Sequence, residues 1–430
     1  QTGPLAPCTP GSLAGWYELQ SRYGKLSFPD VLQPAIKLAT DGYPISKFFI
    51  AETVDQAERI KDPEWHRVFR PNSGWKPGDI IKLPDLAGTL SKIAEEGIDY
   101  FYNGELGAKL AKHMQSVGGV ISIKDLEAVD PILEVPMKAT YRDRLVHVPP
   151  PPAESFQMLL ALKILNSFNV ASLGLLSAPH LDLVFRAIRI AAGLRIQHNR
   201  CNPSDIDVLL SDMTAHIARA GDGTPVVGST EKWSGDADFE ADAPKENTTS
   251  MSIADAYGNM ICLTQSLGSA FGSGVMIPGT GVILNNFLNW TDLNPVSPNA
   301  LQPGQRIAMC LAPSISTVGG KAVLALGTPG SYGILQTQVQ AMVGYMDFGL
   351  DLQAAIEMPR ARLWDGNQIY LERRVPHSVC VELSKRGHDV ALLPDYSWRT
   401  GGMQAVSRDP ESGALAGAAD SRRDGAVIPA

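Results

Sequence analysis

The sequence predicts a layered α/β fold, because the spacing of its hydrophobic residues changes along the chain from that of helices to that of strands. Up to about residue 125, apolar residues recur at three- and four-residue spacing, and several of these segments close on glycine, as helices do. After residue 247 the pattern becomes the alternation of strands, with helical segments among them. Strands with helices on either side favour layered α/β over an all-β sandwich.

Helices and one strand are expected in the N-terminal part of the chain. The helical segments are 11–24, 29–42, 86–97, 155–168 and 179–196, and the last two are apolar enough to be buried. Residues 140–150 alternate apolar and polar side chains, which predicts a strand. They run into four prolines, 149–152, a composition typical of a rigid connector.

The character of the sequence changes from about residue 220 to 247. This stretch is rich in Gly, Asp and Glu and has no period, which predicts a solvated, mobile linker. Directly after it, alternating residues and the turn "DAYGN" predict a β-hairpin that begins at Thr248. The elements expected beyond it are strands 281–287, 312–318 and 321–327, helices 332–349 and 351–360, strand 368–375, helix 377–387 and strand 403–409.

Bulk composition excludes several classes of function. The chain has 430 residues, 44% hydrophobic, and a formal net charge of −8, which argues against a nucleic-acid or anionic-membrane surface. Its apolar runs fall short of the roughly 18–20 residues of a membrane span. Five cysteines and eight histidines are scattered without metal-ligand spacing, so neither a disulfide framework, a metal nor a cofactor is expected.

The first residues contain no charged segment followed by an apolar one, so no signal peptide is visible, and they contain no initial Met. We therefore expect that an upstream segment is missing. The compartment stays open between cytoplasm and periplasm.

The boundary at Thr248 has two interpretations. Asn247-Thr248-Thr249 fits a glycosylation sequon. Alternatively, the chain is cut between Asn247 and Thr248, and Thr248 then carries both a hydroxyl and an α-amine whose pKa of about 7.7–8.0 suits a general base. Such a nucleophile needs donors for an oxyanion, and the turn in "ALGTPGSYGI" offers the N–H groups of Gly330 and Ser331 at a helix start, if it is more than an ordinary strand–helix turn.

Several motifs, in order along the chain, resemble the γ-glutamyltranspeptidase family. They are "GSLAGWYELQSRYGKLSFPDVLQPAIKLATDGYPIS", "VPPPPAESFQMLLALKIL", "NTTSMSIADAYGNMICLTQSLGSAFGSG", "GVILNN", "PGQRIAMCLAPSI" and "GTPGSYGILQTQVQAMVGYMDFGL". The family consists of self-cleaving N-terminal nucleophile hydrolases, which implies a four-layer αββα sandwich. The resemblance implies that 1–247 is a large-subunit part ending in the linker and 248–430 a small subunit. The two chains from one precursor form one structural domain, with a dimer of such pairs as a further option.

The resemblance also implies roles for individual residues. Thr248 is the nucleophile and its amine the base, Thr249 falls on the family's second Thr, and Ser266 stands where a Thr supports the nucleophile's hydroxyl. Gly330 and Ser331 fall on the paired glycines that hold the oxyanion, provided that Ser331 tolerates the backbone angles.

This chain departs from the family where a glutamyl group would bind. The resemblance implies an Asn where this chain has Gly268, a Gln and an Asp where it has Phe287 and Trp290, and a Ser-Ser pair where it has Met309 and Cys310. The family's carboxylate-binding Arg lies in a region that this sequence does not contain. Residues 291–305 are also shorter than the family's lid, which suggests a more open mouth. We therefore expect an amide hydrolase with a different acyl pocket. Phe287 and Trp290 favour an apolar or planar acyl group, unless both are core residues.

The expected function is hydrolysis of a small-molecule amide through an acyl-enzyme on Thr248, with transfer to an amine as an option. No nucleic acid or membrane partner is expected. The alternatives are a genuine γ-glutamyl transferase or glutathione hydrolase, a catalytically dead family member, and a non-catalytic secreted glycoprotein with sequons at Asn247 and Asn289.

Overall fold

The computed structural model describes residues 2–71, 73–199, 201–230 and 246–429. The chain forms two compact units, which are described separately. Unit 1 comprises Gln1–Leu133, Ala243–Asn247 and Ser266–Trp290; unit 2 comprises Glu134–Asp242, Thr248–Gln265 and Thr291–Ala430. Each unit therefore combines segments from both sides of Thr248.

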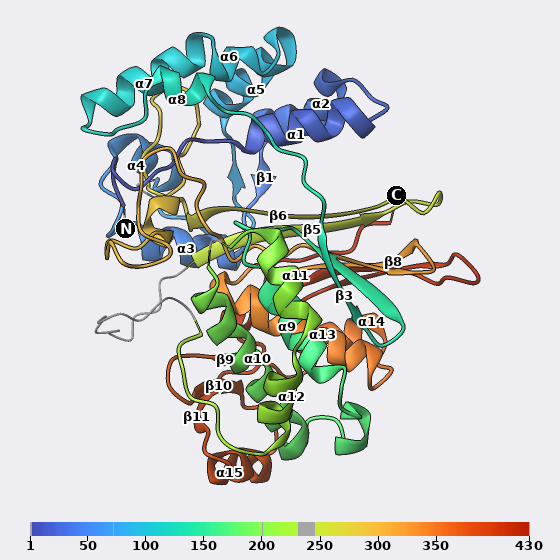
Figure 1. The fold of residues 1–430 in the computed structure, drawn as a ribbon. Helices are drawn as coiled ribbons and strands as arrows, with labels where there is room; N and C mark the ends of the chain where they lie inside the picture. Colours follow the sequence, from blue (N-terminus) through green and yellow to red (C-terminus); the bar gives the residue numbers. More distant parts are fainter. Residues whose placement is uncertain (1, 72, 200, 231–245, 430) are drawn as a thin grey trace. The chain divides into compact units, whose positions relative to one another are not determined.

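A layer of three largely buried helices lies within unit 2 (Figure 1). These are α9 (Phe156–Leu165), α10 (Ala178–Gln197) and α13 (Ile334–Met346), all three predicted. Helix α10 begins where Ser177 accepts a hydrogen bond from the His180 N–H, with a proline in its first turn. Helix α9 contacts α10, α13 and strand β3, and nearly all of its side chains are buried. The layer holds much of the main hydrophobic core.

These helices cover an antiparallel sheet of six strands in the order β13-β12-β8-β7-β4-β3. The strands are β3 (Met137–Tyr141), β4 (Arg144–Val148), β7 (Ser314–Val318), β8 (Lys321–Gly327), β12 (Gln404–Arg408) and β13 (Leu415–Ala419). The single strand predicted over 140–150 is wrong, because the chain reverses at Arg142, which has a left-handed φ of 56°. The alternating pattern continues through this tight turn and conceals it.

The predicted hairpin at Thr248 is present as strands β5 (Glu246–Ala254) and β6 (Met260–Ser269). Its first strand begins two residues earlier than expected. In unit 2 the hairpin packs on the six-stranded sheet: the Ser252 hydroxyl donates to the Gln404 carbonyl at 3.0 Å. Ser250 and Cys262 fill the space above Gly327, where a Cβ would overlap Ser250 Oγ and lie 3.0 Å from Cys262 Sγ. Unit 2 thus contains helix, sheet and hairpin layers in succession.

Smaller elements complete unit 2. They are α11 (Pro203–Ser211), α12 (Thr214–Gly221), α14 (Leu352–Glu357), α15 (His377–Lys385), the 3-10 turns η1 (Val170–Leu173), η3 (Ser331–Gly333) and η4 (Trp398–Thr400), and a sheet of β9 (Ala361–Leu363), β10 (Gln368–Glu372) and β11 (Asp389–Leu393). Helix α12 ends where the predicted linker begins, and residues 231–245 of that linker lie outside the described residues.

Unit 1 is mainly helical, as its sequence period predicts. Its elements are α1 (Ser12–Tyr23), α2 (Phe28–Asp41), α3 (Lys47–Gln56), α4 (Pro63–Phe69), α5 (Pro84–Glu96), α6 (Asp99–Tyr102), α7 (Glu105–Ser116), α8 (Ile123–Glu127), the short pair β1 (Tyr43–Pro44) and β2 (Ile80–Ile81), and the turn η2 (Phe287–Trp290). Among the residues that the structure describes in either unit, no helix combines the length and apolarity needed to cross a membrane.

The strand predicted over 281–287 does not form, apart from an isolated bridge between Met276 and Ile283. The Asn285 side chain accepts the Phe287 N–H at 3.1 Å, a local bond that replaces a ladder bond and leads into η2.

Candidate active site

The predicted site residues fall into two groups, one in each unit. Unit 2 contains the predicted nucleophile and oxyanion residues and one substrate segment, namely Thr248, Thr249, Met309, Cys310, Gly330 and Ser331. Unit 1 contains the predicted support residue and the remaining substrate positions, namely Ser266, Gly268, Phe287 and Trp290. Each group is described within its own unit.

Thr248 lies on strand β5 and is half-buried, whereas Thr249 is exposed. Side chains alternate along a strand, so Thr248 shares a face with Ser250, whose side chain lies against Gly327 at the end of β8. Gly327 is three residues before Gly330. The strand that carries the predicted nucleophile therefore lies against the strand that leads into the predicted oxyanion turn. The side chain of Asn247, on the other side of the predicted cleavage, lies outside the described residues.

The turn after β8 presents two adjacent backbone N–H groups. Gly330 (φ 129°, ψ 35°) precedes η3, which runs directly into α13. Within the described part of the chain, neither the Gly330 N–H nor the Ser331 N–H donates a hydrogen bond. Unsatisfied N–H groups at a helix start attract negative charge. The arrangement is suited to binding an oxyanion.

Gly330 and Ser331 both have positive φ angles, but the two angles differ in whether they allow a side chain. At Gly330 a side chain is disfavoured, because φ is 129° and a Cβ would lie 3.3 Å from the Gly401 Cα. Ser331 has φ 55°, in the left-handed region that non-glycine residues reach at a cost of roughly 1–2 kcal/mol. A serine can therefore adopt the backbone angle that the structure has at this position. Its hydroxyl is buried, with no hydrogen-bond partner among the described atoms.

Residues that the sequence analysis missed support the turn. The Gly402 N–H donates to Thr328 Oγ1 at 3.1 Å, and Thr328 Oγ1 donates to the Pro329 carbonyl at 2.9 Å. Gly401 lies so close that a Cβ there would be 2.6 Å from Thr328 Oγ1. The glycine pair in "RTGGMQ" was the available signal, because a close backbone approach requires glycine.

The substrate segment Met309–Cys310 pairs with the chain that follows the four prolines. The Met309 N–H donates to the Pro152 carbonyl at 3.1 Å, and the Glu154 N–H donates to the Met309 carbonyl at 2.7 Å. Met309 is half-buried, and Cys310 is buried and not in a disulfide. The proline segment is therefore more than a connector, since it holds this segment in place.

A buried ion pair lies behind both the substrate segment and the turn. Arg195 of α10 donates to Glu154 at 2.6 Å, and its guanidinium lies 4.5 Å from the ring centre of Tyr332, the residue after Ser331. Burial opposes the charged form of Arg195, but the charge of Glu154 and a hydrogen bond with Tyr332 keep its pKa above the ordinary value. No local sequence pattern indicates this pair.

In unit 1, the space beside Gly268, where the resemblance implies an asparagine, is filled by a residue from elsewhere in the sequence. Gly268 has φ 94°, and its N–H donates to Ser266 Oγ at 2.8 Å. A Cβ at Gly268 would overlap Oδ1 of Asn286 and lie 3.6 Å from Trp290 Nε1. The Asn286 amide accepts the Ser269 N–H at 3.0 Å and donates to the Ser269 hydroxyl at 2.9 Å. These two hydrogen bonds fix the Asn286 side chain in the space beside Gly268.

Phe287 and Trp290 are both buried, with 8% and 6% of their surfaces exposed. Their ring centres are 6.4 Å apart and the rings are tilted by 54°. Both are therefore core residues, and Trp290 lies beside the space that Asn286 fills at Gly268.

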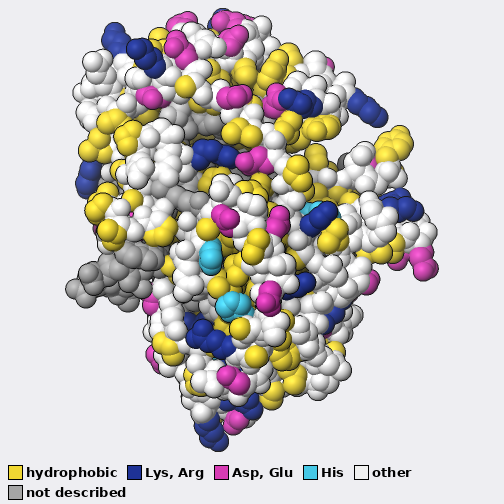
Figure 2. Space-filling view, viewed as in Figure 1, with side chains coloured by type: hydrophobic (Ala, Val, Ile, Leu, Met, Phe, Trp, Pro, Cys, Tyr) yellow, Lys and Arg dark blue, Asp and Glu magenta, His cyan; other side chains and the backbone are white. Residues whose placement is uncertain are grey.

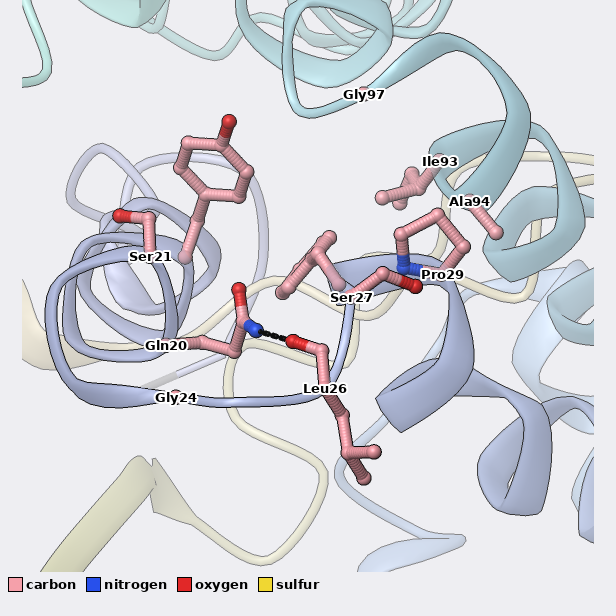
Figure 3. A pocket seen from close by; sticks show the side chains of 11 residues that line it. Gln20, Ser21, Gly24, Leu26, Ser27, Pro29, Ile93, Ala94 and Gly97 are labelled. Atoms are coloured by element: carbon pink, nitrogen blue, oxygen red, sulfur yellow. Dashed lines mark hydrogen bonds between the residues drawn. The ribbon is translucent and has the colours of Figure 1, made fainter.

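A separate pocket of about 400 Å³ lies in unit 1 between α1, α2 and α5. Figure 3 shows Gln20 and Leu26 at its edge, with the Gln20 amide turned to the Leu26 carbonyl. None of the predicted site residues lines it.

On the face shown in Figure 2, acidic and basic side chains are interspersed without a large patch of one sign. Within the ranges that the structure describes, no three His, Cys, Asp or Glu side chains are grouped as metal ligands.

Comparison with known proteins gives one consistent picture. The family model for gamma-glutamyltranspeptidase matches residues 1–430. The chain is 33% identical over 430 residues to "Acylase ACY 1 proenzyme" of Pseudomonas sp. (strain SE83), covering 99% of this chain and 75% of that protein. It is 30% identical over 437 residues to the glutathione hydrolase proenzyme of Bacillus subtilis (strain 168), covering 97% and 74%.

Among solved structures, the cephalosporin acylase from Bacillus halodurans is similar with a TM-score of 0.88 at 28% identity, covering 99% of this chain and 79% of that one. The predicted α/β fold of the N-terminal nucleophile hydrolase type is confirmed.

Proposed function

Because the chain belongs to the γ-glutamyltranspeptidase family, we propose that it is a self-cleaving amide hydrolase whose nucleophile is Thr248. The observation that carries the proposal is the pair of adjacent N–H groups at Gly330 and Ser331, which donate no hydrogen bond within the described residues, in the unit that also contains Thr248. A nucleophile and two donors for the oxyanion are what acyl transfer requires.

Cleavage between Asn247 and Thr248 generates the catalytic group. It releases the α-amine of Thr248, which takes the hydroxyl proton at neutral pH without a separate histidine. The names of the acylase and glutathione hydrolase relatives both include "proenzyme", which supports processing into two chains. The products are residues 1–247 and 248–430.

The reaction then runs in two steps. Thr248 Oγ attacks the amide carbonyl, and the N–H groups of Gly330 and Ser331 stabilise the oxyanion. The protonated amine of Thr248 returns its proton to the leaving amine. Water, activated by the same amine, resolves the acyl-enzyme.

The acyl group differs from γ-glutamyl. At the five positions where the resemblance implies polar side chains that hold a zwitterion, this chain has Gly268, Phe287, Trp290, Met309 and Cys310. Burying an ammonium and a carboxylate without partners costs several kcal/mol. We therefore assign an acylase-type activity on an acyl amide without the α-amino and α-carboxylate pair. A genuine γ-glutamyl hydrolase is the second candidate, supported by the glutathione hydrolase relative.

The test compares the wild type with Thr248→Ala and Thr248→Ser. Purified wild type is expected to give two chains on a denaturing gel, with Thr248 as a new N-terminus. Thr248→Ala is expected to give one chain without amide hydrolysis, and Thr248→Ser to retain cleavage at a reduced rate. Glutaryl, aromatic acyl, oxamate and γ-glutamyl amides separate the two candidates. An intact wild-type chain, or hydrolysis by Thr248→Ala at the wild-type rate, would refute the proposal.

A further inference from the structure

Unit 2 contains a buried ionic cluster that the mechanism does not use. It consists of two arginines and two carboxylates, Arg360, Glu372, Asp420 and Arg422, with no side-chain exposure. Arg422 binds Glu372 through two bonds of 2.7 Å and Asp420 at 3.0 Å. Arg360 binds Asp420 at 2.5 Å.

The cluster is also bonded to the loop of residues 397–403. Glu372 accepts the Ser397 N–H at 2.8 Å, and Arg360 Nε donates to the Thr400 carbonyl at 3.2 Å. Asp420 accepts the Met403 N–H at 3.1 Å. Four buried charges contribute little net stability compared with apolar side chains of the same volume. We therefore consider the geometry that their hydrogen bonds impose on this loop.

One hydroxyl is hydrogen-bonded both to this loop and to the oxyanion turn. Thr328 is fully buried; its Oγ1 accepts the Gly402 N–H at 3.1 Å and donates to the Pro329 carbonyl at 2.9 Å. That carbonyl and the Gly330 N–H belong to the same planar peptide group and point in opposite directions. A bond to the carbonyl therefore sets the direction of the N–H.

We propose that Thr328 is a positioning residue, whose hydroxyl orients the peptide plane carrying the Gly330 N–H and is itself held by the ionic cluster through residues 397–403. The proposal rests on the proposed function, in which that N–H binds the oxyanion. Glycine at 330 leaves the peptide plane free to rotate, and a rotated plane would present a carbonyl oxygen to the oxyanion. A β-branched threonine, with few χ1 states, is suited to prevent this.

The experiment uses Thr328→Val, which removes the hydroxyl at nearly constant volume, and Thr328→Ser, which retains it. Thr89→Val is the matched control, because Thr89 is also buried and donates to a carbonyl, that of Thr280 at 2.8 Å. Turnover is measured with whichever of the glutaryl, aromatic acyl, oxamate and γ-glutamyl amides the wild type hydrolyses fastest, and processing of each variant is checked on a gel.

We expect Thr328→Val to lower kcat about 10- to 100-fold with KM within about twofold, less than the loss of a whole oxyanion donor. Thr328→Ser is expected to stay within about threefold of wild type, and Thr89→Val to lose thermal stability with kcat unchanged. As a single substitution, Arg360→Lys is expected to lower kcat. In the Thr328→Val background it is expected to lower kcat little further, since both substitutions act through the bond between the Thr328 hydroxyl and the Pro329 carbonyl.

The experiment distinguishes a failure of the proposed function from a failure of the role proposed for Thr328. If the wild type hydrolyses none of the glutaryl, aromatic acyl, oxamate and γ-glutamyl amides, or Thr248→Ala is as active as wild type, the proposed function fails. If those controls behave as expected and Thr328→Val keeps the kcat of Thr89→Val, the role of Thr328 alone is refuted. A crystal structure gives a readout independent of turnover: the Pro329–Gly330 peptide plane is expected to rotate in Thr328→Val but not in Thr89→Val. An unchanged plane would overturn the proposal.

Discussion

Restoring the family's asparagine at position 268 is expected to destabilise the protein without creating γ-glutamyl activity. Gly268 has φ 94°, and the space of its missing side chain is filled by the Asn286 amide. An asparagine at 268 would therefore have to displace Asn286 before it could reach a substrate. The lost anchor cannot be regained by a single substitution.

The magnitude has two components. A non-glycine residue at this φ costs about 1–3 kcal/mol. Displacing Asn286 breaks its bonds to the Ser269 N–H and hydroxyl, at about 0.5–1.5 kcal/mol each. Gly78→Asn is a matched control, because Gly78 also lies in unit 1, has φ 90° and would have no atom within 4 Å of its Cβ. The control carries only the backbone cost, so Gly268→Asn should be less stable than Gly78→Asn by about 1–3 kcal/mol.

Urea denaturation in the single-chain Thr248→Ala background measures this difference, and a common m value converts midpoints to free energies. Hydrolysis of γ-glutamyl-p-nitroanilide is measured with Thr248 intact. Gly268→Asn as stable as Gly78→Asn, together with γ-glutamyl turnover above wild type, would refute the reasoning.

Two further predictions concern buried polar groups. Ser331→Ala removes a buried hydroxyl without a described partner and should raise the free energy of unfolding by about 1 kcal/mol with turnover retained; a loss of turnover would show that the hydroxyl takes part in the reaction. Burial lowers the pKa of His180 from 6.5 to about 4, so between these values the unfolded chain binds a proton that the folded chain does not. Acidification from pH 7 to below pH 4 should cost the wild type about 3 kcal/mol more than His180→Asn, and equal losses in urea titrations across this range would contradict the assigned pKa.

Local pattern was sufficient for much of the fold and for part of the candidate site. Helical periods located α9, α10 and α13, and alternation located the hairpin that carries Thr248, because both depend on residues a few positions apart. The turn at Gly330 and Ser331 was visible for the same reason. The two wrong strand predictions, at 140–150 and 281–287, also have local causes. The chain reverses in a tight turn at Arg142, and the Asn285 side chain accepts the N–H of Phe287, so neither segment forms the strand that its alternating pattern predicts.

The sequence by itself thus determined the layers, the position of Thr248 on a strand and the glycine-containing turn that follows β8. Only the tertiary structure decided what supports them. Asn286 fills the space of Gly268 from 18 positions away, Gly402 reaches Thr328 across 74, and Arg360 meets Asp420 across 60. No period or short motif encodes such pairs, because each forms only when packing brings distant segments together and burial forces their polar groups to find partners.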